Sequence, residues 1–143
     1  MKGIYVLLVF LLLAGEIFSQ DLAGEWKGSF IDDSRKYSTE DRYKINFYFT
    51  KISDSVFQAF SKTFNVSHDS AICILEGGFL EKNILYLKET KAIQPYSADG
   101  TTTCFQIMKL YYYKRKNKLM LRGEWNTEGK DCGYGSIILT KKL

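Results

Sequence analysis

Few side chains in this sequence are of the types that commonly carry out catalysis. The single histidine, His68, lies in a polar segment at residues 65–69. A Ser–His or Cys–His pair would need this histidine to face a nucleophile, and we interpret it instead as a solvated turn residue. The sequence contains no G-x-S-x-G, phosphate-binding or H-E-x-x-H pattern. We therefore predict that the protein is not an enzyme and uses no metal or other cofactor.

Two glutamates and three cysteines are the other candidates for chemistry. Glu25 and Glu124 each precede a tryptophan, and alternation places both on the polar side of their segments, as surface residues. Cys73, Cys104 and Cys132 are 31 and 28 residues apart and form no C-x-x-C pair, which argues against structural zinc. Three cysteines allow at most one intramolecular disulfide.

Basic residues gather at residues 114–118 (Lys-Arg-Lys-Asn-Lys), directly after three consecutive tyrosines at 111–113. A basic, aromatic hairpin can contact nucleic acid or an anionic envelope surface, and a solvated turn accounts for the same residues. The net charge of the whole chain is +4. Because the N-terminus also has the pattern of an export signal, we predict no nucleic-acid partner.

The N-terminus has the pattern of a secretory signal peptide. Lys2 precedes an apolar run from Ile4 to Ala14, which is shorter than the roughly 20 residues of a membrane span. We predict removal of residues 1–20, by cleavage after Ser19 or Gln20, and a secreted or periplasmic protein. An uncleaved membrane anchor is the alternative. In a eukaryotic secretory pathway, Asn65-Val-Ser would be a glycosylation sequon.

The remaining residues, 21–143, are sized for one domain. The chain is 45% hydrophobic, 25% charged and 15% aromatic, with one proline, which excludes disordered and collagen-like proteins. The clearest strand is Tyr43–Lys51, in which bulky apolar and polar residues alternate. Seven similar runs, separated by turn residues, are Leu22–Ile31, Ser55–Asn65, Ala71–Leu80, Ile84–Glu89, Thr102–Lys114, Leu119–Asn126 and Tyr134–Lys142.

Eight consecutive strands with short connections predict an all-β, antiparallel, up-and-down barrel. Closing the sheet removes both exposed edges, and eight strands enclose an interior that holds side chains or one small ligand. An open sandwich is the alternative, but its topology needs long crossovers, and only residues 90–101 are long enough to form one.

The first predicted strand carries Gly24-Glu25-Trp26. This G-x-W pattern resembles the signature at the start of lipocalin and avidin-like (calycin) barrels. The resemblance implies a lipocalin-like barrel in which Trp26 closes one end and a basic side chain of the last strand packs over it. Lys141 or Lys142 could take that place, since the last strand has no arginine. A second triplet, Gly123-Glu124-Trp125, repeats the pattern on the seventh strand.

The barrel topology also suggests which cysteines pair. The sixth and eighth strands are parallel, so Cys104 and Cys132 belong to the same end of the sheet. Two strand spacings exceed the reach of a disulfide, so the loop at Asp131 would have to fold inward. We predict a Cys104–Cys132 bridge, with three unpaired buried thiols as the alternative.

Two functions fit such a barrel. The first is binding of a small apolar or aromatic molecule inside the barrel. The second is a structural or interaction role for a solidly packed barrel, with outer aromatics such as Tyr48, Tyr111 and Tyr113 contacting an envelope or protein partner. For the first, strand alternation predicts the lining residues Trp26, Tyr43, Phe47, Phe60, Leu75, Tyr112 and Trp125.

Overall fold

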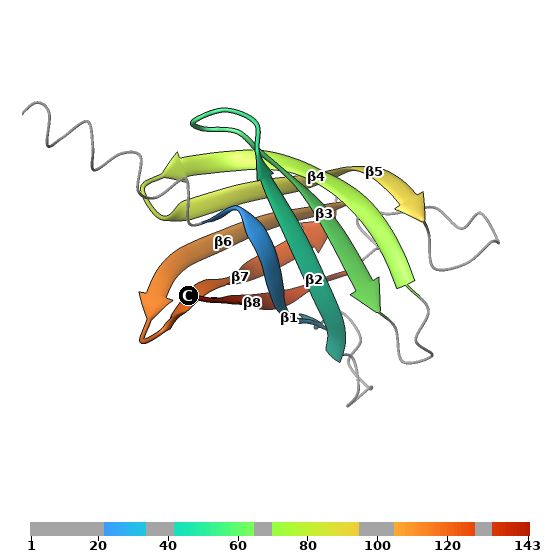
Figure 1. Ribbon diagram of the computed structural model, residues 1–143. Helices are drawn as coiled ribbons and strands as arrows, with labels where there is room; N and C mark the ends of the chain where they lie inside the picture. Colours follow the sequence, from blue (N-terminus) through green and yellow to red (C-terminus); the bar gives the residue numbers. More distant parts are fainter. Residues whose placement is uncertain (1–21, 34–41, 65–69, 95–104, 128–132) are drawn as a thin grey trace, which may run out of the picture.

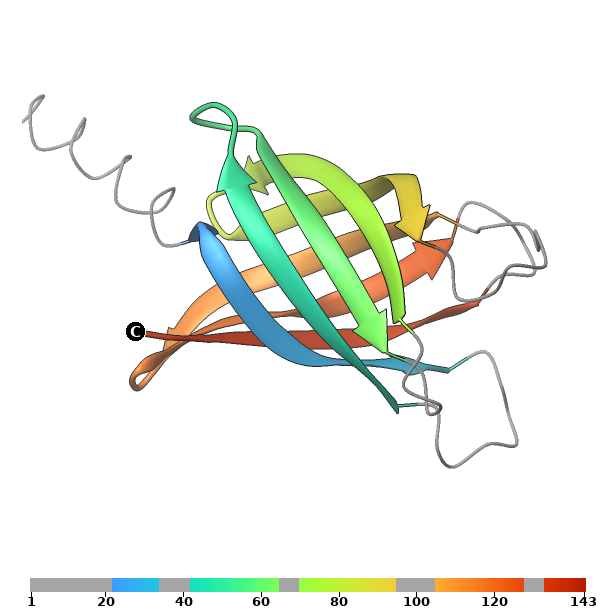
Figure 2. The ribbon, with the colours of Figure 1, turned by 45° about the vertical axis from the view of Figure 1, so that its right-hand side comes forward.

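The chain folds into a closed barrel of eight antiparallel strands in consecutive order (Figures 1 and 2). The computed structural model describes residues 22–33, 42–64, 70–94, 105–127 and 133–143. The strands are β1 (Gly24–Asp32), β2 (Arg42–Lys51), β3 (Phe57–Phe64), β4 (Ser70–Glu81), β5 (Ile84–Gln94), β6 (Gln106–Arg115), β7 (Lys118–Thr127) and β8 (Tyr134–Lys142). Strand β8 pairs with β1 and closes the sheet. The predicted up-and-down barrel is confirmed, and the open sandwich is excluded.

Strand β5 is longer than alternation predicts. It continues past Glu89 to Gln94, and its register with β4 shifts between Ile72 and Cys73 and again between Ile74 and Leu75. Such irregularities break the alternation of inward and outward residues. Residues 90–94 therefore lack the period of two that reveals the other strands.

The two ends of the barrel differ. At one end, which we call the floor end, tight turns join β2 to β3, β4 to β5 and β6 to β7, and there β1 begins and β8 ends (Figure 2). The opposite end, which we call the loop end, is where the described chain stops before and resumes after residues 34–41, 65–69, 95–104 and 128–132.

Gly123 allows β7 to bend into the barrel wall. A Cβ atom at this position would lie 1.9 Å from the Lys109 carbonyl oxygen of β6, far inside van der Waals contact. Only glycine lets the two backbones approach this closely, and glycines of this kind mark the corners of β-barrels.

Candidate ligand-binding cup

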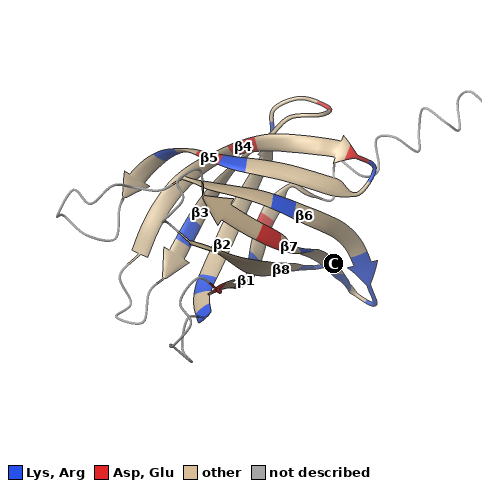
Figure 3. Cartoon of the chain, turned by 180° about the vertical axis from the view of Figure 1, so that it is seen from behind, with Lys and Arg blue, Asp and Glu red and all other residues tan. Residues whose placement is uncertain are grey.

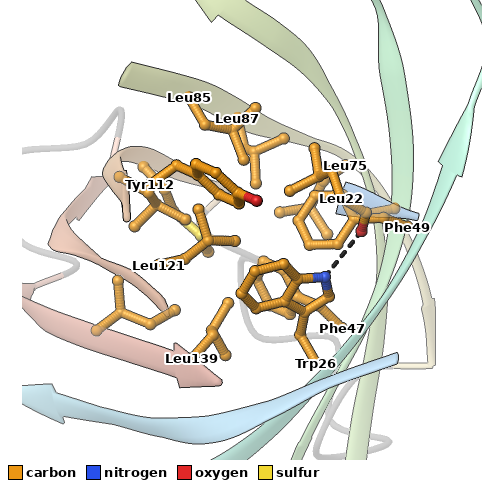
Figure 4. Close-up of a cluster of buried hydrophobic side chains, with 14 of the residues drawn as sticks. Leu22, Trp26, Phe47, Phe49, Leu75, Leu85, Leu87, Tyr112, Leu121 and Leu139 are labelled. Carbon is orange, nitrogen blue, oxygen red and sulfur yellow. Dashed lines mark hydrogen bonds between the residues drawn. The ribbon is translucent and has the colours of Figure 1, made fainter. Parts of the chain in front are cut away.

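Trp26 closes the floor end. Its side chain is fully buried, and its indole N–H donates a 2.8 Å hydrogen bond to the Leu22 carbonyl oxygen (Figure 4). Gly24, which lies between them, has a φ of 103°, a conformation that residues with side chains rarely adopt. The glycine of the G-x-W pattern thus permits the local turn, and Trp26 forms the floor that the resemblance implies.

Other aromatic rings surround Trp26. Phe49 and Tyr112 each lie 6.3 Å from the indole, measured between ring centroids, in edge-to-face geometry. Phe79 packs edge-to-face on Tyr112 at 6.1 Å and on Phe57 at 6.0 Å. These arrangements are favourable beyond the area that they bury, so the rings form a continuous aromatic plug.

A basic side chain of the last strand reaches the same end. The ammonium group of Lys141 donates a hydrogen bond to the Ala23 carbonyl oxygen, beside the start of β1. Lys142 is exposed. Of the two lysines that the resemblance suggests, Lys141 is therefore the one placed at the floor.

The middle of the barrel is a packed core. Phe47, Leu75, Leu87, Leu121 and Leu139 are all fully buried, and Figure 4 shows them converging on Trp26. The floor half of the interior is thus filled by side chains of the protein itself.

The loop end has an aromatic wall on one side, which consists of Phe30, Tyr43 and Trp125. The rings of Phe30 and Tyr43 are stacked, with centroids 4.7 Å apart. Trp125 packs edge-to-face on Phe30 at 5.6 Å. Its indole N–H donates a 3.0 Å hydrogen bond to the Ile31 carbonyl oxygen, which fixes the ring against β1.

The other side of the loop end has a polar wall, which consists of Ser61, Thr63, Cys73 and Glu89. Ser61 is only 1% exposed, Thr63 is also buried, and Cys73 is the cross-strand partner of Ser61. Within the described part of the chain, neither hydroxyl has a hydrogen-bond partner. Buried polar groups in native proteins normally have one, so these two hydroxyls need an explanation.

Glu89 is the buried charged residue of the described chain. One of its carboxylate oxygens accepts a 2.9 Å hydrogen bond from the Gln106 backbone N–H, and the carboxylate also accepts one from the Cys73 thiol. Burial raises the pKa of Glu89 to about 7, although the two hydrogen bonds oppose the shift. Both protonation states are therefore populated at neutral pH, and this carboxyl can accept or donate a hydrogen bond.

The thiol of Cys73 is not activated as a nucleophile. Burial, and then the charge of Glu89, raise the pKa of Cys73 to about 12. The thiol therefore stays protonated at neutral pH. A nucleophilic role would require the thiolate.

The predicted lining residues divide between the two halves of the barrel. Trp26, Phe47, Leu75, Tyr112 and Trp125 belong to one buried core cluster, and Tyr43 packs against it. Of these, Tyr43 and Trp125 lie at the loop end, where we place the candidate cup between the aromatic and polar walls. Phe60 was predicted to face inward, and that prediction is wrong, since its side chain is 39% exposed on the outer face. The inward residues of β3 are Phe57, Ala59, Ser61 and Thr63.

The polar wall is the part of the site that the sequence analysis missed. A signal was available in β3, where Phe57, Ala59, Ser61 and Thr63 alternate, and in β5, where Glu89 continues the spacing of Leu85 and Leu87. Serine, threonine and glutamate are usually exposed. When they face the interior of the barrel, the strand is therefore easily assigned the wrong inward face.

The outer face of β5–β8 carries two open grooves, of about 620 and 560 Å³. Exposed side chains line most of both, among them Lys109, Tyr111, Arg122 and Glu124. Glu25 of β1 and Glu124 of β7 are both exposed, as predicted.

Several predicted features cannot be placed. His68, Cys104, Cys132 and the segment 1–20 lie outside the described residues, and Cys73 is a free thiol. Among the described residues there is no cluster of three or more His, Cys, Asp or Glu suited to a metal ion. No helix in the described ranges has the length and hydropathy of a membrane span.

Comparison with known proteins supports the fold. No family model matches the sequence, and no curated protein matches it significantly. The structure is similar to a redesigned β-barrel, mFAP1, bound to DFHBI, with a TM-score of 0.62, 10% identity and coverage of 86% of this chain and 96% of that one. It is similar to EF1p2_mFAP2b bound to DFHBI, with a TM-score of 0.61, 7% identity and coverage of 87% and 96%. A de novo designed fluorescence-activating β-barrel matches with a TM-score of 0.52, 9% identity and coverage of 85% and 93%. At these identities the likeness concerns the fold alone, and the chain has a lipocalin-like barrel.

Proposed function

We propose that this protein is an exported, non-enzymatic binding protein that holds a small apolar or aromatic molecule in the cup at the loop end. The observation that carries the proposal is the pair of buried hydroxyls, Ser61 and Thr63, which have no hydrogen-bond partner within the described residues. A buried polar group without a partner costs about 1–3 kcal/mol. A polar atom of a bound molecule would remove that cost.

The two walls of the cup suit different parts of such a molecule. The stacked pair of Phe30 and Tyr43, with Trp125 beside it, offers flat apolar surface to a ring. Across the cup, Ser61 and Thr63 can donate or accept hydrogen bonds, and Glu89 can do the same because of its raised pKa. A mostly apolar site with a few polar groups is the usual composition of a small-molecule pocket.

The structural comparisons lend support. Two barrels of similar fold, mFAP1 and EF1p2_mFAP2b, are bound to DFHBI. An eight-stranded barrel of this kind is therefore compatible with holding a molecule.

Export is part of the proposal and rests on Lys2 and the apolar run after it. We expect protein recovered from the periplasm or medium to have an intact mass that corresponds to a start at Gln20 or Asp21. A chain that keeps residues 1–20 and sediments with membranes would contradict export as a free protein.

A fluorescence titration of the full chain with 1-aminoanthracene tests the cup. We expect saturable one-site binding, because the probe combines an aromatic ring, which suits the aromatic wall, with an amine, which suits the polar wall. Thr63→Val keeps the shape and removes the hydroxyl, and should weaken binding about 5- to 10-fold, the equivalent of one hydrogen bond. The matched control is Thr50→Val on the exposed outer face. No saturable binding, or equal effects of the two variants, would refute the proposal.

The outer grooves favour a second candidate, a protein-contact role. Tyr48 and Tyr111 are both more than 40% exposed, and Tyr111 and Tyr113 line one groove together with Lys109 and Arg122. Exposed tyrosine and arginine are typical of protein interfaces. A Tyr111→Ser variant that abolishes co-purification of a specific partner, with the cup's affinity unchanged, would establish this role.

A further inference from the structure

The floor end carries an exposed rim that the ligand cup does not use. We call it the floor rim, and it consists of residues 51–56, 80–83, 114–118 and 142–143. Its segments contact one another or the neighbouring strands. The Leu143 backbone N–H donates to the Asn117 carbonyl oxygen at 3.2 Å, and the Tyr112 N–H donates to the Asn83 carbonyl oxygen at 2.8 Å. On the far side, the Ser55 carbonyl oxygen lies against Gly78 of β4.

Positive charge is concentrated on this rim. The fold places the end of β8 beside the β6–β7 turn, where Lys118 pairs with Lys142, and Figure 3 shows the basic hairpin next to the C-terminus. The rim contains seven lysines and arginines but two carboxylates, Asp54 and Glu81. Asp54 is paired with Lys51 at 3.0 Å. The whole chain has a net charge of only +4, so the rim accounts for its entire positive excess.

Aliphatic side chains project from the same rim. Leu80, Leu143 and Ile52 are 72%, 61% and 60% exposed, the highest values among the large hydrophobic residues of the described chain. Val56 is exposed beside Ile52. Exposed aliphatic residues that are flanked by lysines form the pattern of surfaces that bind at a membrane interface.

The backbone conformation at the tip of the β6–β7 turn is a second indication that the rim has a function. Lys116 has a φ of 52°, in the left-handed region, where glycine, asparagine and aspartate are the usual residues. A lysine in this conformation is disfavoured. Strained positions of this kind tend to persist where the side chain has a function.

We propose that the floor rim docks the barrel on an anionic lipid bilayer, with its basic side chains on the headgroups and its aliphatic side chains at the acyl boundary. Nucleic acid could pair with the basic side chains of the rim, but it would leave the exposed leucines and isoleucine without an apolar partner. Docking by the floor end directs the cup away from the bilayer, toward solution. The described chain also begins at this end, at Leu22.

Vesicle flotation with the full chain tests the proposal. The probes are vesicles of phosphatidylcholine alone and of phosphatidylcholine mixed with phosphatidylglycerol. Each basic residue near an anionic surface contributes about fivefold to partitioning. Neutralising four of them should therefore weaken binding to the mixed vesicles by about two orders of magnitude or more. High salt should weaken binding by the wild type as well. The test variant carries Lys114→Gln, Arg115→Gln, Lys116→Gln and Lys118→Gln.

A control variant with the same change in charge carries Arg42→Gln, Lys44→Gln, Lys91→Gln and Lys109→Gln, all at exposed positions off the rim. It should bind within about threefold of wild type, because its lysines and arginine do not face the bilayer. A third variant, Leu80→Ser with Ile52→Ser, keeps the charge and should bind at least about tenfold more weakly. Circular dichroism of each variant checks that the barrel is intact.

Three results would overturn the proposal. Equal binding to both kinds of vesicle would assign the interaction to the apolar N-terminal segment, which all variants share. Equal losses of binding in the test and control variants would show that binding depends on the net charge of the protein and not on the floor rim. Binding of a short DNA duplex in preference to mixed vesicles, with no loss in the serine variant, would identify a nucleic-acid surface instead.

Discussion

At the scale of single residues, Glu89 has the most specific consequence. Its pKa rises from an ordinary 4.5 to about 7 in the folded protein. Above a pH of about 4.5 the unfolded chain releases a proton that the folded chain retains, so the stability present at lower pH is lost as the pH rises to about 7. The loss is on the order of 3 kcal/mol.

Glu89→Gln should abolish most of this loss. Urea unfolding at about pH 5 and pH 8 measures it, as the difference between the two free energies of unfolding. The variant should be more stable than wild type at the higher pH, because no charge is then buried. Glu124→Gln, at an exposed site, should keep the wild-type difference. A wild-type difference in Glu89→Gln would show that another group is responsible.

Trp26 is the residue on which the floor depends. Trp26→Ala should cost about 3–5 kcal/mol, because it removes a fully buried ring and leaves a cavity. Trp26→Phe, which keeps the ring but loses the hydrogen bond to Leu22, should cost less. Urea unfolding gives both values, and a loss below about 1 kcal/mol for the alanine variant would contradict the assignment.

The limits of sequence reasoning are visible at this scale. Trp26 was predictable, because a G-x-W pattern and alternation agree. The outward orientation of Phe60 was not predictable. Phe57 and Phe60 are three residues apart and lie on opposite faces of β3, and only the structure decides which of them is inward. Ser61 and Thr63 were missed because their side chains are polar yet buried.

At the scale of elements, the β6–β7 hairpin combines a stable register with a disfavoured turn. Lys116→Gly should stabilise the protein by about 1 kcal/mol, since glycine adopts the left-handed conformation without a penalty. Lys118→Gly makes the same change in charge at a strand position and should destabilise the protein by about 0.5–1 kcal/mol. Thermal unfolding distinguishes them, and equal shifts in Tm would contradict the conformational argument.

Element boundaries were predictable where polar and apolar residues alternate without interruption, as in β2. They were not predictable in β5, because the shifts of register against β4 interrupt the alternation after Glu89. The tight turns were visible as clusters of polar and charged residues. The closeness of the C-terminus to the β6–β7 turn follows from the antiparallel pairing of β7 with β8, in which Lys118 is the partner of Lys142.

At the scale of the whole molecule, we assign two roles to the barrel interior: a packed floor half and a proposed cup at the loop end. The high aromatic content serves both: one set of rings fills the floor, and another forms one wall of the cup. The sequence predicted the closed barrel, and it predicted an interior lined by aromatics. It could not predict the division, which depends on which rings share a level in the barrel.

Ser61→Leu tests whether the cup has room. Adding bulk to a well-packed core costs about 1–3 kcal/mol, whereas a cup with space should accept the leucine at a cost below about 1 kcal/mol. The free energy of unfolding in urea measures the difference. A larger loss would mean that side chains already fill the loop end.

The central claim is that the cup holds a small molecule, and native mass spectrometry of the protein purified from its own host tests it most directly. The account predicts a noncovalent adduct of one small molecule on the wild type, which is lost in Ser61→Leu although the barrel stays folded. A bare mass for the wild type, or an adduct that persists in Ser61→Leu, would contradict it.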